Sequence, residues 1–98
     1  MVEQGDIVKV GGVDVPLLIV SSNIYNKSGA AVACPIVKNA DNATLKVFIE
    51  NEQVSGFVLC DNMKRVNIGE RGYTSKGHTP LTKMIMIIDM IQSIFDYL

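Results

Sequence analysis

The chain has 98 residues, 48% of them apolar, and nine Lys and Arg against ten Asp and Glu give a formal charge of −1. This length predicts one domain over residues 1–98, and the apolar content excludes a disordered chain. The charge balance excludes a globally basic nucleic-acid binder of the histone kind, although a local basic face is still allowed.

Two strands are predicted in the first twenty residues. Residues 6–10 alternate loosely between polar and apolar, as in a half-buried strand, and Gly11-Gly12 marks a turn. Residues 15–20 are apolar and rich in β-branched side chains, which is typical of a central strand buried on both faces. Pro16 must then lie near the strand start, where its missing N–H does least harm.

Turn residues separate the strands that follow. The tetrapeptide Asn26-Lys27-Ser28-Gly29 predicts a turn with a left-handed position at Gly29, and residues 39–42 predict another. Further strands are expected at residues 30–37, 44–50, 56–60 and 64–68. In the second of these, Leu45, Val47 and Ile49 share one face.

The last segment changes to a helical period. One apolar face is predicted from Leu81, Met84, Ile85, Ile88, Ile91, Phe95 and Leu98, with Thr79-Pro80 as cap and first-turn proline. A second apolar side comprises Met86, Ile87, Met90, Ile94 and Tyr97. Either a loop covers this second side, or it meets another subunit or a partner peptide. The pattern predicts an α+β, mainly β fold, a small barrel of short strands with a C-terminal helix.

The two cysteines do not form a metal motif. Cys34 and Cys60 lie in apolar runs without C-x-x-C spacing, and the chain has one His, so we expect buried thiols in a reducing compartment and no metal. The N-terminus lacks the basic and apolar regions of a signal peptide, and no apolar run is long enough to cross a bilayer. The expected location is therefore cytoplasmic, with no membrane partner.

Positive charge is concentrated in residues 64–78. This window has one acid, Glu70, against five basic side chains, Lys64, Arg65, Arg71, Lys76 and His78. Its Gly, Ser and Thr residues and Tyr73 predict a flexible cationic loop, which either contacts nucleic acid or is simply solvated. His78 is an exposed residue, a helix-capping residue or a catalytic one. Lys38, at a strand end, either contacts phosphate or is an ordinary exposed residue.

Several segments resemble the MazF/PemK/Kid-like toxins of type II toxin–antitoxin systems. Residues 5–10 resemble the opening G-[DE]-[IV]-x-x-[VA], and residues 16–21 resemble the second strand, R-P-x-[LV]-[IV]-[LIV], without its Arg. Residues 32–37 resemble V-x-P-x-T, and residues 56–66 resemble G-x-[VA]-x-x-D-Q-[VP]-[KR]-[ST]-[IV]. Residues 70–72 resemble the A-R-G that follows.

The resemblance implies an SH3-like barrel, a homodimer and a cognate antitoxin peptide that wraps across the dimer. It also implies sequence-specific cleavage of single-stranded RNA without a cofactor. CcdB, a gyrase poison, shares the fold, so fold alone does not settle function.

The resemblance also locates departures from the family's active site. The family's catalytic Arg, which ends a long first loop, falls on Val15, and its catalytic Thr or Ser falls on Val37. An Arg that some members use falls on Leu59, and only Asp61 matches a residue with a proposed catalytic role.

Metal-free RNA cleavage needs a base for the 2′-hydroxyl and a cation for the phosphorane. Arg65 is the candidate for the cation. Asp61 is either a base or the anchor of a turn.

Two alternatives to a nuclease remain open. One is a non-catalytic family member that binds antitoxin, RNA or another target. The other is a CcdB-like topoisomerase poison acting through the aromatic tail Phe95-Asp96-Tyr97-Leu98.

Overall fold

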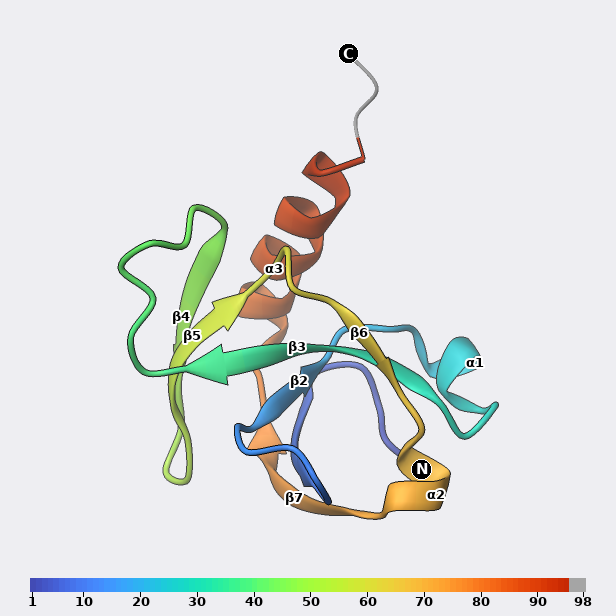
Figure 1. The fold of residues 1–98 in the computed structure, drawn as a ribbon. Coiled ribbons are helices and arrows are strands. Elements are labelled where there is room, and N and C mark those ends of the chain that lie inside the picture. The colour runs from blue at the N-terminus through green and yellow to red at the C-terminus, as the bar shows by residue number, and fades with distance from the viewer. Residues whose placement is uncertain (96–98) are drawn as a thin grey trace.

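The computed structural model describes residues 1–95, which form a strongly bent antiparallel sheet with a helix against it (Figure 1). The elements in chain order are β1 (Asp6–Val10), β2 (Leu17–Ile19), α1 (Asn23–Asn26), β3 (Ala31–Val37), β4 (Lys46–Glu50), β5 (Ser55–Leu59), β6 (Lys64–Val66), α2 (Ile68–Arg71), β7 (Tyr73–His78) and α3 (Leu81–Ser93). The predicted fold class, a small mainly β barrel with a C-terminal helix, is confirmed. No helix within this part of the chain is long and apolar enough to span a membrane.

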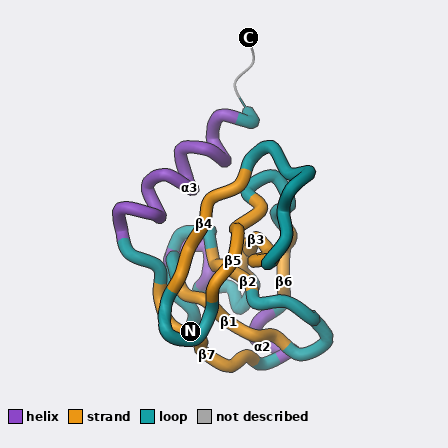
Figure 2. The backbone as a smooth tube through the Cα atoms, turned by 90° about the vertical axis from the view of Figure 1, so that its left-hand side faces the viewer, coloured by secondary structure: helices purple, strands orange, loops and turns teal. Residues whose placement is uncertain are grey.

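Strand β3 lies at the centre of the sheet and pairs with three other strands. The strand order is β4-β5-β3-β2-β1-β7, and β6 also pairs with β3. The C-terminal half of β3 pairs with β5 (Ile36 with Val58), and its N-terminal half pairs with β6 (Ala33 with Lys64). The turn between β5 and β6 therefore changes the direction of the chain beside β3, which bends the sheet toward a barrel (Figure 2).

The core has two parts, one on each face of β2. Leu18 packs in the larger cluster, which lies between the sheet and α3, and Ile19 packs in the smaller cluster inside the barrel. Both side chains are fully buried. Adjacent residues of a strand point to opposite faces, so the prediction of a strand buried on both faces is confirmed, with ordered pairing limited to Leu17–Ile19.

The turn predicted at Gly29 is confirmed, because this glycine has φ of 91°. The sequence did not predict α1, a single helical turn that precedes it. The turn is capped by Ser22, whose Oγ accepts a hydrogen bond from the Tyr25 N–H (3.2 Å).

The buried face of α3 differs from the predicted one. Met84, Ile87 and Ile91 are buried at i, i+3 and i+7, whereas Leu81 is 74% exposed and Ile85 53% exposed. A helix that is apolar on two sides fits more than one stripe, and contact with the sheet selected the stripe that includes Ile87. Leu98 and Tyr97 lie outside the described residues.

The predicted cap of α3 is also wrong. Pro80 occupies the N-cap position and makes no side-chain capping bond. Thr79 is 1% exposed, its N–H donates to the Gly5 carbonyl (2.8 Å), and its hydroxyl has no partner. The backbone bond to Gly5 ties the start of the helix to β1, so Thr79 is a buried junction residue.

The predicted flexible loop is largely ordered secondary structure. Helix α2 and strand β7 occupy residues 68–71 and 73–78, and β7 pairs with β1, for example Tyr73 with Val10. The polar residues of β7 carry little intrinsic strand signal, and the pairing with the free edge of β1 supplies its hydrogen bonds instead. Gly72, with φ of 72°, makes the turn from α2 into β7.

Both cysteines are fully buried, as predicted. Burial raises the pKa of the Cys34 thiol to about 12 and that of Cys60 to about 11, and the nearby Asp61 carboxylate adds to both increases. Because only the thiolate reacts, both residues should label slowly with a thiol reagent in the native protein at neutral pH and rapidly after unfolding. Time courses with and without denaturant check this, and rapid native labelling of both thiols would contradict their placement.

Candidate functional site

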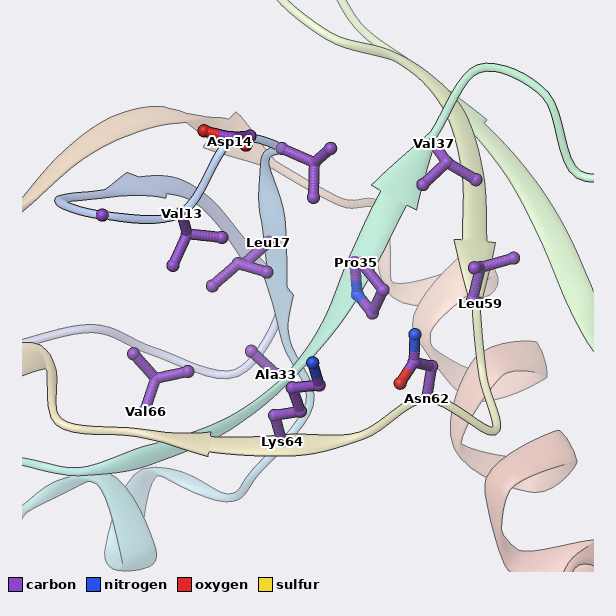
Figure 3. Close-up of a pocket in the computed structure, with 12 residues that line it drawn as sticks. Val13, Asp14, Leu17, Ala33, Pro35, Val37, Leu59, Asn62, Lys64 and Val66 are labelled. Carbon is purple, nitrogen blue, oxygen red and sulfur yellow. The ribbon is translucent and has the colours of Figure 1, made fainter.

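The loop between β1 and β2, together with β3, β5, β6 and the turn before β6, lines an open pocket of about 430 Å³, which we call the β3 pocket (Figure 3). It is lined by Gly12, Val13, Asp14, Val15, Leu17, Ala33, Pro35, Val37, Leu59, Asn62, Lys64 and Val66. Most of these side chains are apolar, and the polar ones are Asp14, Asn62 and Lys64.

The alternation of β3 builds the floor of the pocket. Ala33, Pro35 and Val37 point to the same face, and the Ile36 N–H donates to the Pro16 carbonyl (2.9 Å). This bond holds the end of the β1–β2 loop against β3. Figure 3 shows Val37 and Leu59 next to each other, projecting from β3 and β5.

The fold brings three distant positions into this one pocket. Val15, Val37 and Leu59 all line it, and they are the positions at which the resemblance places the family's catalytic Arg, Thr or Ser, and alternative Arg. The structure thus unites the three positions but presents three aliphatic side chains. None of them can transfer a proton or stabilise a phosphorane.

The predicted catalytic residues lie outside the β3 pocket. On β6, Lys64 and Val66 line the pocket while Arg65 does not, because successive side chains of a strand alternate between faces. Asp61 is exposed in the turn after β5, between the pocket residues Leu59 and Asn62. The strand therefore directs Lys64, rather than Arg65, into the pocket.

The predicted RNA-binding residues fall in three places. Lys64 lines the pocket, and Lys38 is exposed directly after the pocket residue Val37. Arg71 supports the pocket from outside, since its Nη1 donates to the Gly11 carbonyl (3.1 Å) at the start of the β1–β2 loop. Lys76 and His78 lie on β7, away from the pocket.

The contacts of β7 place Lys76 beside the turn between β4 and β5, and His78 beside the start of β1. Asn51 Nδ2 donates to the Lys76 carbonyl (3.1 Å), and His78 Nδ1 lies 2.8 Å from Asp6 Oδ1. The basic window, predicted as one flexible loop, is therefore divided between two regions of the molecule.

Sequence reasoning missed Asn62 as a pocket residue. The signal was present, because Asn62 stands at the Gln of the family's D-Q-[VP]-[KR] motif and Lys64 stands at its basic position. In the same alignment Arg65 stands at a Ser or Thr position. The aromatic tail that motivated the topoisomerase-poison alternative lies, apart from Phe95, outside the described residues.

Comparison with known proteins identifies the family of this chain. The family model described as "PemK-like, MazF-like toxin of type II toxin-antitoxin system" matches residues 3–95. Curated protein sequences give no significant match.

Solved structures with a similar fold include a MazE–MazF complex from Deinococcus radiodurans, with a TM-score of 0.85, 23% identity, and coverage of 95% of this chain and 94% of that one. An endoribonuclease in complex with its cognate antitoxin from a mycobacterial species has a TM-score of 0.83 and 20% identity over the whole of both chains. At these identities the two structures show a shared fold and no more, whereas the family match covers nearly the whole chain. This chain therefore belongs to the PemK-like, MazF-like toxins of type II toxin–antitoxin systems.

Proposed function

We propose that this toxin acts on single-stranded RNA, which it binds in the β3 pocket. The observation that carries the proposal is the convergence of Val15, Val37 and Leu59, the family's catalytic positions, on a single open pocket that Lys64 also lines. A cationic side chain beside apolar walls suits a nucleotide, because the ammonium attracts the phosphate and the walls accept the base.

Two of the three polar pocket residues have a role in this proposal. Lys64 contacts phosphate, and Asn62 offers an amide donor and acceptor to a base edge. The walls formed by Val13 and Leu17 bury the face of the base. Arg71, through its bond to Gly11, holds the loop that carries Val13.

Cleavage in this pocket requires a cation near the scissile phosphate. The sequence assigns that task to Arg65, with Asp61 as base, and this assignment stays a prediction. Lys64 is the alternative that the geometry favours, because its side chain lines the pocket. The second candidate function, RNA binding without cleavage, is favoured by the aliphatic side chains at all three of the family's catalytic positions.

A cleavage assay separates the two candidates. Purified protein is incubated with a long single-stranded RNA without added metal, and fragments are resolved by electrophoresis beside a binding measurement over a range of salt concentrations. Fragments with 2′,3′-cyclic phosphate ends support the nuclease. Salt-sensitive binding without fragments supports the non-catalytic binder, and absence of both contradicts the proposal.

We further propose a cytoplasmic homodimer with a cognate antitoxin peptide as its partner. Exposed apolar side chains on and just after α3 motivate the dimer: Leu81, Ile85, Met86, Ile94 and Phe95. Antitoxins accompany the similar Deinococcus and mycobacterial toxins. The two free buried thiols agree with a reducing compartment.

Light scattering at micromolar concentration should give twice the chain mass, because burying exposed apolar side chains of this helix in a second copy removes apolar area from water. Leu81→Lys together with Ile85→Lys should shift the mass to that of one chain while leaving the circular dichroism unchanged, since both side chains are exposed. A strict monomer before substitution would contradict the dimer.

A further inference from the structure

The outer face of β4 and β5 carries an aromatic pair that the β3 pocket does not include. The rings of Phe48 and Phe57 meet edge to face, with centroids 5.3 Å apart and an angle of 65° between ring planes. Phe48 is 43% exposed, and Lys46 Nζ lies 5.5 Å from the centre of the Phe57 ring. Lys46 Nζ also donates to the Ala40 carbonyl (2.7 Å), which holds its chain across the sheet.

The register of the sheet connects this aromatic patch (Lys46, Phe48 and Phe57) to the pocket. Val37 pairs with Phe57, which in turn pairs with Phe48. Directly opposed residues of antiparallel strands point to the same face. The pocket residue Val37 and the two rings therefore form a row across one face of the sheet. Two strand spacings separate β3 from β4, which places Phe48 about 10 Å from Val37.

A second connection runs through Leu59. This pocket residue follows Phe57 by two positions, so both side chains point to the same face of β5. Leu59 also pairs with Lys46. The floor of the β3 pocket therefore continues across β5 into the aromatic patch on the same face of the sheet.

We propose that Lys46, Phe48 and Phe57 form a nucleobase-stacking subsite, which takes a base of single-stranded RNA adjacent to the nucleotide in the β3 pocket. The inference rests on the proposed RNA function. Aromatic side chains stack any base, because every base has a π-face. An adjacent ammonium supplies the phosphate contact that a stacked nucleotide also needs.

The distribution of charge favours RNA over a peptide as the occupant. Lys64 lines the pocket and Lys46 pairs with the pocket residue Leu59, so the pocket and the patch each carry a cation on the same face of the sheet. A peptide would instead add a strand to the free edge of β4, using backbone groups and no cluster of cations.

The test is the affinity for a 2′-O-methyl single-stranded RNA of about ten nucleotides, a length within the range such sites occupy, measured by fluorescence anisotropy. This RNA lacks the attacking 2′-hydroxyl and stays intact. Phe48→Leu keeps an apolar side chain but removes the flat ring, and it should weaken binding roughly tenfold. Phe48→Tyr keeps the ring and should bind like the parent. Tyr25→Ala is the matched control, because Tyr25 is an aromatic residue of similar exposure on α1, and it should have no effect.

A single ribonucleotide is the second probe, because it can fill the β3 pocket but has no second base to stack on Phe48. Its affinity should fall in Lys64→Ala and be unchanged in Phe48→Leu. Unchanged binding of the longer RNA by Phe48→Leu, with weakened binding by Lys64→Ala, would overturn the stacking subsite and leave the RNA function standing. Failure of the parent protein to bind either probe would overturn both the subsite and the RNA function. Loss of antitoxin binding in Phe48→Leu with intact RNA binding would assign the patch to a peptide and overturn the subsite.

Discussion

Lys64→Ala should reduce RNA cleavage roughly a hundredfold, because removal of a group that stabilises developing charge typically has an effect of this size. If the protein binds RNA without cutting it, the same change should weaken binding and lower the slope of log affinity against log salt by about 0.7, the share of one phosphate contact on a single strand. The fold should survive, since Lys64 is exposed at the surface of β6. Gel-resolved cleavage rates and salt titrations by fluorescence anisotropy provide the two measurements.

Arg65→Ala is the matched comparison, because Arg65 is the neighbouring cation on the same strand and lies outside the pocket. It should change the cleavage rate by no more than a few fold. The reverse result, a large loss in Arg65→Ala and a parent rate in Lys64→Ala, would return the catalytic role to Arg65. It would also place the scissile phosphate on the other face of β6.

Gly56→Ala should lower the free energy of unfolding by about 1–3 kcal/mol, the usual scale for forcing an extra carbon into a packed core. A Cβ at this position would lie 2.7 Å from the Val37 carbonyl oxygen and 3.0 Å from Ile36 Cγ2. The carbonyl belongs to a paired strand and cannot move aside as the end of a flexible side chain would. Loss of glycine's freedom in the unfolded chain offsets only about 0.4–1 kcal/mol of this destabilisation.

Urea unfolding followed by circular dichroism measures the difference. Ser55→Ala is the control, because Ser55 is the exposed neighbour on β5 and its change should stay within about 0.5 kcal/mol of the parent. A Gly56→Ala protein as stable as the parent would mean that β3 and β5 can separate locally at little cost. Because Val37 lines the β3 pocket, a destabilised but folded variant should also bind RNA more weakly.

The sequence by itself determined the features that depend only on residues close together along the chain. Alternation predicted β1 and β4, the apolar β-branched run predicted β2, and the left-handed turn at Gly29 followed from its flanking residues. The helical period predicted α3. The family followed from short motifs in a fixed order along the chain. Each of these signals depends on residues close together in sequence, so no knowledge of long-range packing was needed.

Tertiary structure decided the features that depend on distant partners. Strand β7 exists because β1 offers it a free edge, and the helix buries Ile87 because the sheet meets α3 on that side. Val15 and Leu59 are 44 positions apart and line the same pocket only because β2 and β5 both pair with β3.

The choice between Lys64 and Arg65 had the same origin. Neighbours on a strand face opposite ways, and the pairing of β6 with β3 fixed which of the two enters the pocket. A one-residue change of register would have exchanged them, and the charge pattern of the sequence would have been the same in either case.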